Sequence, residues 1–116
     1  MQVARLYTGE DGESHFGDLQ LSYTVMVDRI VPEVMPATGV EFRRSPDRTF
    51  FDWHRAPMRM YMVTLDGAVE FATGDGTKRV FYPGDVLLVE DETGRGHTTR
   101  CIGEWRRITV AIPAGE

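Results

Sequence analysis

The sequence is poor in several features that would assign it to particular classes of protein. Only one of its 116 residues is a cysteine, Cys101, so an intramolecular disulfide is excluded. No apolar run approaches the ~18 residues of a membrane-spanning helix, and the N-terminal residues lack the apolar stretch of a signal peptide. We therefore expect a cytoplasmic protein that does not cross a membrane.

Positive charge is also scarce. Thirteen lysines and arginines stand against eighteen aspartates and glutamates, which gives a net charge of -5. Nucleic-acid binding requires clustered cations that neutralise phosphates, whereas the arginines of this chain are scattered. We therefore expect no nucleic-acid partner.

Helical periodicity is hard to find, and short β-rich runs punctuated by Gly, Pro and Asp take its place. A hydrophobic fraction of 41% and a length of 116 residues are enough for one core. The pattern predicts a single all-β domain over residues 1–116, with residues 28–38 as an irregular connection and a candidate binding loop. Strands are predicted at 2–7, 15–26, 39–44, 49–55, 59–65, 68–73, 77–81, 85–89, 96–101 and 105–112.

Two turns are specified by their residues. Residues 74–76 (Gly-Asp-Gly) lie between two strand-like runs, and glycine adopts a positive φ at little cost, so a tight hairpin is predicted there. Residues 83–85 (Pro-Gly-Asp) lead into the apolar run VLLV, where proline fixes the first corner of a turn and glycine relieves the second. Many short strands joined by such turns are typical of a sandwich or a barrel.

The stretch from residue 53 to residue 101 resembles the cupin superfamily of small jelly-roll β-barrels. In the first cupin motif two histidines precede a glutamate and a glycine. His54 and Gly67 match the first histidine and the glycine, whereas Ala56 and Met60 replace the second histidine and the glutamate.

The second cupin motif is matched more closely. Gly84 lies in the Pro-Gly-Asp turn, the strand VLLVE follows, and His97 matches the histidine that completes the family's metal site. Glu90 stands where the family has proline, and the loop after it is about two residues longer. The resemblance implies a single-domain cupin jelly-roll β-barrel and, as in many small cupins, a homodimer. Because cupins include enzymes, sugar-binding regulators and storage proteins, it implies no particular reaction.

Alternation along the predicted strands brings candidate pocket residues together. His54 and Ala56 share one strand face, and the corresponding faces of other strands carry methionines, threonines and the cysteine. Two imidazoles in an otherwise apolar pocket are typical of a small-molecule site. We predict His54 and His97 as its polar centre, and as ligand-binding residues Met60, Met62, Thr64, Thr99, Cys101 and Asp52.

Two chemistries are open for these histidines. His54 and His97 are candidate ligands of a divalent transition metal, with Asp52 or Cys101 completing a weak site, although stable sites usually have three or more protein ligands. The alternative is metal-free acid–base catalysis by His54 and His97. A tyrosine acid, as in some cupin epimerases, would be Tyr61 or Tyr82, but alternation puts Tyr61 on the opposite face from Met60.

Three functional hypotheses follow. The chain is an enzyme acting on a small molecule in the barrel, a non-catalytic binding or sensor domain, or a structural dimer, and the lack of an output domain in this sequence favours the enzyme slightly. The remaining polar residues are interpreted as structural or solvated. His15 is expected to be structural, and exposed positions without a role are expected for Arg43, Arg44, Arg106, Arg107, Asp91 and Glu92.

Overall fold

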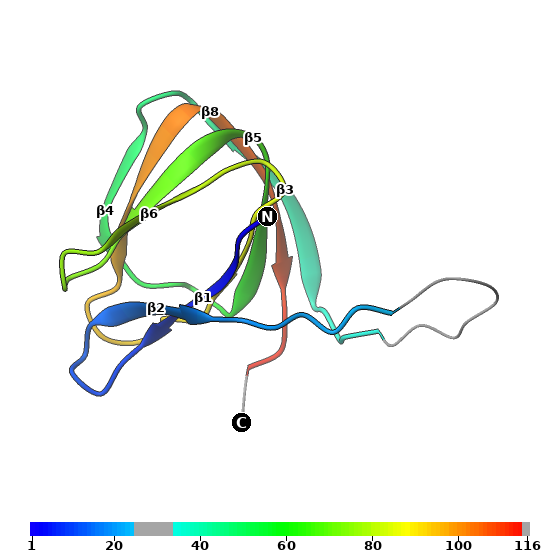
Figure 1. Cartoon of the computed structure of the whole chain (residues 1–116), viewed down its shortest axis with the longest axis horizontal. Helices are drawn as coiled ribbons and strands as arrows, with labels where there is room; N and C mark the ends of the chain where they lie inside the picture. The colour runs from blue at the N-terminus through cyan, green and yellow to red at the C-terminus, as the bar shows by residue number, and fades with distance from the viewer. Residues whose placement is uncertain (25–33, 115–116) are drawn as a thin grey trace.

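The computed structural model describes residues 1–24 and 34–114 and has an all-β architecture (Figure 1). Every regular element in these residues is a strand, which confirms the predicted fold class at this level. None of the described segments forms a helix of the length and apolarity required to cross a membrane. The strands are β1 (Val3–Thr8), β2 (Ser14–Asp18), β3 (Gly39–Ser45), β4 (Phe50–His54), β5 (Met60–Ala72), β6 (Lys78–Phe81), β7 (Val86–Val89) and β8 (His97–Ala111).

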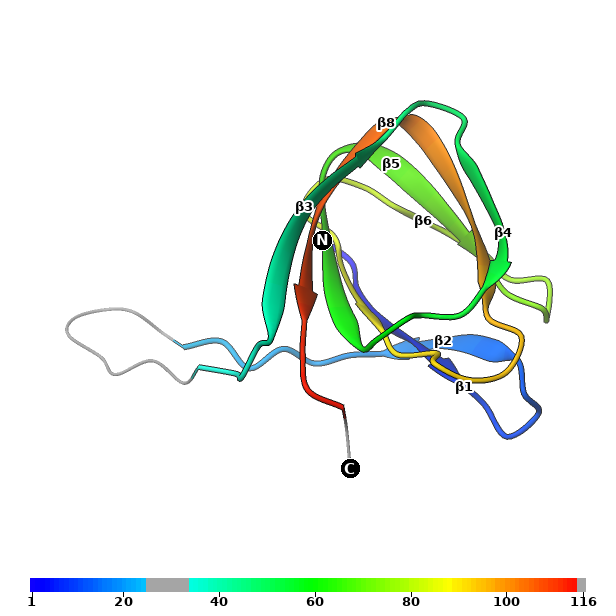
Figure 2. The same cartoon turned by 180° about the vertical axis from the view of Figure 1, so that it is seen from behind.

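All eight strands belong to one strongly curved sheet (Figures 1 and 2). Its main path runs β2-β1-β7-β5-β8-β3, with β4 also paired to β8 and β6 to β5. The β1–β7 pair is parallel and the others are antiparallel. Within the described residues, β2 and β3 at the two ends are not paired with each other, so the sheet is open rather than a closed barrel.

In two places, a pair of strands predicted as separate forms one long, bulged strand in the structure. The runs predicted at 59–65 and 68–73 form β5, and those at 96–101 and 105–112 form β8. Gly67 has a φ of 67° and lies where the register between the two strands shifts. A Cβ at Gly67 would overlap the backbone carbonyl of Glu104 on β8, so the glycine permits close approach within the sheet instead of ending a strand.

The predicted strand at 15–26 was too long. Strand β2 ends at Asp18, and residues 19–24 lie outside any strand, while 25 and 26 lie outside the described residues. Of the irregular connection predicted at 28–38, residues 34–38 are irregular as expected and 28–33 lie outside the described residues.

Both predicted turns are confirmed. The hairpin between β5 and β6 closes through hydrogen bonds from the amide of Thr73 to the carbonyl of Thr77 and from that of Gly76 to the carbonyl of Thr73. In the second turn Gly84 has a φ of 90°, and the Asp85 amide donates to the Tyr82 carbonyl over 2.9 Å. This is the arrangement of a type II turn, which requires a positive φ at its third residue.

One apolar core lies inside the curved sheet. Phe71 forms its centre, because its ring meets Phe81 edge-on at 5.8 Å and Trp105 edge-on at 6.2 Å between centroids. Edge-to-face contacts at such distances are the favoured geometry of aromatic pairs. The other core side chains come mainly from β1, β5, β7 and β8, and the buried set includes Ala4, Leu6, Val69, Leu87, Val89 and Cys101.

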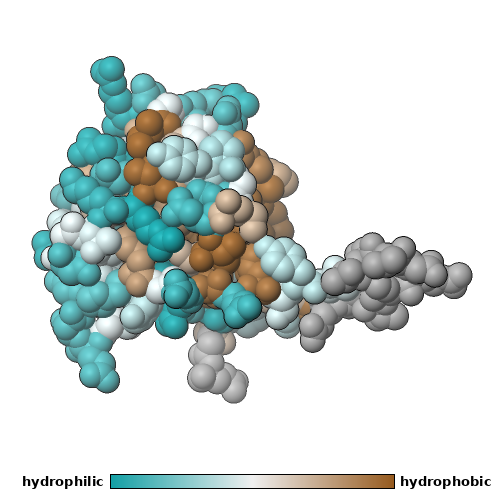
Figure 3. Space-filling model, in the orientation of Figure 1, coloured by the Kyte–Doolittle hydropathy of each residue, from teal (hydrophilic) through white to brown (hydrophobic). Residues whose placement is uncertain are grey.

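Strand β3 presents apolar side chains to the outside. In the orientation of Figure 1, apolar atoms gather in the middle of the visible face and along the side where β3 lies (Figure 3). On β3 itself Phe42 is 78% exposed and Val40 57% exposed. The homodimer expected from the sequence resemblance stays a prediction.

The junction of β4 and β8 fixes the relative position of two histidines. His54 at the end of β4 lies directly opposite His97 at the start of β8. Gly96 precedes His97 with a φ of 82°, and a Cβ at Gly96 would overlap the backbone carbonyl of His54. Only glycine therefore allows the two strand ends to approach this closely.

Replacement of this glycine should disrupt the junction. Gly76 is a matched control, because its φ is 86° but no atom lies within 4 Å of a Cβ built there. We expect Gly76→Ala to lower the free energy of unfolding by about 1 kcal/mol, the cost of the left-handed conformation alone. Gly96→Ala adds steric overlap and should cost about 3 kcal/mol or more. Urea unfolding of both variants measures the difference, and equal costs would contradict the close approach.

Candidate functional site

A cavity of about 210 Å³ opens between β4, β5 and β8. Its wall is mainly apolar and includes two of the methionines predicted from the sequence, Met60 and Met62. The polar groups on it are two imidazoles, one threonine and two guanidinium groups. These polar lining residues are His54, His97, Thr99, Arg43 and Arg107.

A bulge in β4 decides which of its side chains face the cavity. Phe51 pairs with Thr99 and His54 with His97, so three steps along β4 correspond to two along β8. The extra residue breaks strict alternation, and Phe51 and His54 both line the cavity although their spacing is odd. Asp52, predicted to bind ligand, is exposed and does not belong to the lining.

The two imidazoles lie in direct contact. Their ring centroids are 4.5 Å apart and their planes meet at 62°. Nδ1 of His54 is 2.7 Å from the backbone carbonyl oxygen of Asp52, which only accepts, so this nitrogen carries the hydrogen. Nε2 of His54 then carries the lone pair of the neutral ring, and it has no hydrogen bond to any described residue.

His97 is held by a buried carboxylate. Its Nδ1 lies 2.6 Å from Oδ2 of Asp91, and both residues are almost fully buried, at 2% and 0% exposure. The expectation that Asp91 lies on an exposed loop was wrong, whereas Glu92 is exposed as expected. Asp91 is buried by its contacts with Ser14 on β2 and His97 on β8, and contacts between distant segments leave no periodic signal in the sequence.

Asp91 is fixed from two further sides. The hydroxyl of Ser14 donates to Oδ2 of Asp91 over 2.6 Å, and the backbone carbonyl of Asp91 accepts from the amide of Ala56. The other carboxylate oxygen, Oδ1, is buried without a partner among the described residues. A carboxylate held in this way orients the imidazole, as in other histidine–carboxylate pairs.

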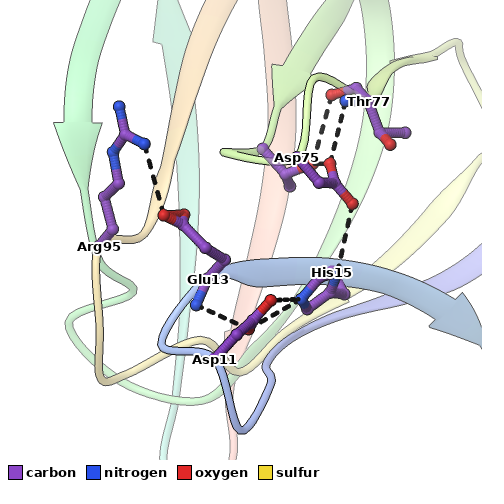
Figure 4. A network of polar contacts seen from close by, with 7 residues as sticks. Asp11, Glu13, His15, Asp75, Thr77 and Arg95 are labelled. Atoms are coloured by element: carbon purple, nitrogen blue, oxygen red, sulfur yellow. Dashed lines mark hydrogen bonds and ion pairs between the residues drawn. The ribbon is translucent and has the colours of Figure 1, made fainter.

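Next to Ser14, a surface network ties the β1–β2 turn to the β5–β6 hairpin (Figure 4). Nε2 of His15 lies 3.0 Å from both carboxylate oxygens of Asp11, and its Nδ1 lies 3.3 Å from Asp75. Because both ring nitrogens face acceptors, the network is complete only when His15 is protonated. It fixes the strand that carries Ser14 and therefore contributes to the placement of Asp91. His15 is structural, as the sequence analysis expected.

Each group of this network has a shifted pKa. The hydrogen bond to Asp11 raises the pKa of His15, with a smaller contribution from Asp75. The hydrogen bond from the Thr73 hydroxyl, followed by that from the Thr77 amide, lowers the pKa of Asp75 to about 2. The hydrogen bond with His15 lowers the pKa of Asp11. All three charged forms are thus favoured by folding.

Arg107 lies at another part of the cavity wall. The expectation that it lies on the surface was wrong. Only 6% of this residue is exposed. The signal was available in the sequence, because Arg107 has the same parity as His97 and Thr99. Dividing β8 into two predicted strands hid that parity, whereas the continuous strand turns Arg107 inward and Arg106 outward.

Four other candidate residues from the sequence do not line the cavity. The hydroxyl of Thr64 accepts a hydrogen bond from the indole nitrogen of Trp105 over 3.1 Å. Cys101 belongs to the apolar core, where burial raises the pKa of its thiol. Tyr61 donates a hydrogen bond to the sulfur of Met35, and Tyr82 is exposed. These four residues are therefore not among the lining side chains, whereas Met60, Met62 and Thr99 are.

The donor set does not fit a stable metal site. His54 and His97 offer two imidazoles, but their neighbours on the wall, Ala56 and Met60, provide neither an imidazole nor a carboxylate, and Asp52 is exposed and does not line the cavity. In the described ranges no three His, Cys, Asp or Glu residues are grouped closely enough to hold an ion. Three or more ligands are the rule for such ions, so we derive no step through a metal.

Comparison with known proteins adds little. No protein-family model matches the sequence, and no curated protein matches it. Among solved structures, a conserved protein of unknown function from Streptococcus pyogenes is similar over 84% of this chain and 100% of its own. Its TM-score is 0.49 and its sequence identity 12%, so this likeness says nothing about the chemistry of the site.

The His15 network should make stability depend on pH in a defined window. A raised histidine pKa stabilises the fold below about pH 6.5 and stops doing so as the pH rises through the folded value. The lowered aspartate pKa values stabilise it above about pH 4. We therefore expect His15→Gln to lower the free energy of unfolding more at about pH 5.5 than at about pH 8.5.

Urea unfolding at the two pH values tests this expectation. Glu10→Gln is the control, because Glu10 is exposed and forms no ion pair with any described residue. This variant should change stability by the same small amount at both pH values. A His15→Gln effect independent of pH would show that the ring acts by packing alone, for example against Tyr7 at 6.1 Å.

Proposed function

We propose that this chain is an enzyme that moves a proton on a small organic molecule held in the cavity between β4, β5 and β8. The observation that carries the proposal is that His97, which lines the cavity, is hydrogen-bonded to the buried carboxylate of Asp91 behind it. Such a carboxylate orients the imidazole and compensates the charge that a base acquires during a reaction.

In this proposal His97 is the base. Its Nδ1 is held by Asp91, which leaves the lone pair of the neutral ring on Nε2. Nε2 would take a proton from a carbon next to a carbonyl group, and the electron pair of the broken C–H bond would move into the enolate. The enolate then takes a proton back on carbon, either the same one or one from another donor, and its electron pair forms the new C–H bond. Asp91 stabilises the imidazolium that forms between the two steps.

In the same proposal His54 is a second group that can donate or accept a proton. Its ring is in contact with that of His97, and its Nδ1 is tied to the Asp52 carbonyl, so its Nε2 is the atom that can exchange a proton. With two imidazoles at one wall, a proton can be removed from one atom of the substrate and another returned to a different atom, as an isomerisation requires. The apolar wall of Met60, Met62 and Phe71 excludes water from the intermediate.

We also propose that the curved sheet is a member of the cupin architecture. The resemblance of the two sequence motifs and the position of His54 opposite His97 support this assignment. The matching histidines would then have kept their place while the metal ligands at positions 56 and 60 were lost. Proton transfer without a metal is the chemistry that such a site can still perform.

The proposal is tested by hydrogen exchange, which requires no knowledge of the product. Pyruvate, acetoacetate, acetone and cyclohexanone are incubated with the protein in D₂O, and loss of the C–H signal next to the carbonyl is followed by proton NMR. We expect exchange on at least one compound, unaffected by EDTA. His97→Gln and His54→Gln should each slow it by ~10²–10⁴-fold, the usual contribution of a general acid or base.

Glu10→Gln is the control, since Glu10 is exposed and lies outside the cavity, and it should retain the wild-type exchange rate. Exchange that survives in the double variant of His54 and His97 would contradict the assignment of these residues. Compounds that bind to the wild type without exchanging would instead favour a non-catalytic binding domain.

A further inference from the structure

Arg107 is a buried cation without a buried anion beside it. Its Nη1 donates to the Ser45 hydroxyl over 2.8 Å and to the Trp105 carbonyl over 3.3 Å. Its Nε is buried with no hydrogen-bond partner, and no carboxylate of the described residues lies within 4.0 Å of the guanidinium group. Burial lowers the pKa of Arg107 to about 10, so the group is still charged at neutral pH.

The guanidinium group is nevertheless held in a fixed plane. Its central carbon lies 3.8 Å from the centroid of the Trp105 ring, the geometry of a cation–π contact. Trp105 is in turn fixed by the hydrogen bond from its indole nitrogen to Thr64. With Nη1 engaged, the edge formed by Nε and Nη2 has no hydrogen bond to a described residue. This is the edge with which arginine binds a carboxylate through two parallel hydrogen bonds.

A second arginine strengthens the case. Arg43 on β3 lies directly opposite Arg107 on β8, and both line the cavity. Like charges at directly opposed positions of a sheet destabilise it unless an anion lies between them. Arg43 is itself only loosely paired, since its Nε is 3.5 Å from Glu41 and 45% of its side chain is exposed. Two cations thus converge on a wall that holds no carboxylate of the described chain.

We propose that Arg107, assisted by Arg43, binds the carboxylate of a small organic acid, which is the ligand of the cavity. This inference rests on the proposed function and adds the chemical class of the substrate and the group that orients it. The acid end of the ligand lies at Arg107, and its body lies along Met60, Met62 and Phe71 toward His97. Arg107 is therefore the residue that selects acids over neutral compounds.

Size and charge favour a carboxylate over a phosphate ester. The cavity of about 210 Å³ is smaller than the ~300–1,000 Å³ of pockets for drug-sized ligands, so a compound of few carbons fits. A phosphate carries up to two charges and three strong acceptor oxygens, whereas one free guanidinium edge satisfies one carboxylate. Apart from Arg43, Thr99 and the two histidines, the wall is apolar and provides no further donors for the remaining oxygens.

Titration with two matched ligands tests the inference. Butyrate and butyramide have nearly the same size, and only the first is an anion. We follow the ¹⁵N resonance of the Arg107 Nε–H group and measure both dissociation constants, with inorganic phosphate as a third probe. We expect butyrate to bind the wild type ~10–100-fold more tightly than butyramide and to shift this resonance, as expected for a charge-assisted hydrogen bond.

Arg107→Met should remove this preference, whereas Arg106→Met should keep it. Arg106 is the control because it is the neighbouring residue on the outer face and pairs with Glu104. Arg107→Lys keeps the charge but lacks the planar edge, so it should retain only part of the preference for butyrate. This variant tests the inference even if Arg107→Met folds poorly. We expect Arg107→Met to unfold at the same urea concentration as the wild type or a higher one, because it removes an unpaired buried charge.

The result is separable from the proposed function. His97→Gln should slow exchange by ~10²–10⁴-fold but change butyrate affinity by less than ~3-fold, whereas Arg107→Met should remove the preference for butyrate over butyramide. Equal affinity for butyrate and butyramide, absence of binding by both, or unchanged selectivity in Arg107→Met would overturn the inference. Tighter binding of phosphate than of butyrate at the same resonance would overturn the assignment to carboxylic acids.

Discussion

The in–out alternation of β8 is the constraint on which the candidate site depends. Every second residue of this strand from His97 to Thr109 turns inward, except near Gly103, where the strand is distorted. The strand can remain continuous over fifteen residues because glycines in β5 and β8 absorb the change in curvature. One strand therefore delivers an imidazole at its start and a guanidinium group near its end to the same cavity wall.

The two ends of this wall carry a buried imidazole, His97, and a buried guanidinium group, Arg107. Asp91 holds the imidazole of His97, and Arg107 has no carboxylate partner among the described residues. Burying charge costs free energy unless hydrogen bonds or ion pairs compensate it, so such groups are typical of a site that interacts with a ligand. An acid bound at Arg107 would compensate the charge of the guanidinium group, and the rest of the ligand would extend toward His97.

The support of Asp91 extends to the surface. Ser14 contacts it from β2, and the adjacent His15 network fastens β2 to the β5–β6 hairpin. The β7–β8 loop that carries Asp91 is also tied to the β1–β2 turn, since the Arg95 amide donates to the carbonyl of Gly12. Buried polar groups in the site are thus positioned by segments far apart in the sequence, which is common where loops provide functional residues on a rigid sheet.

The sequence by itself determined the all-β class and the turns at 74–76 and 83–85, because short β-rich runs and turn chemistry are local properties of the chain. The meeting of His54 with His97 was expected from the resemblance to known sequence motifs, since alternation alone is interrupted by the bulge in β4. It did not reveal the unbroken length of β5 and β8, since a glycine in a bulge and a glycine in a turn have the same local signature. The burial of Asp91 and Arg107 was decided only by the tertiary structure. A charged residue is expected in water, and only the packing of distant segments around it can decide otherwise.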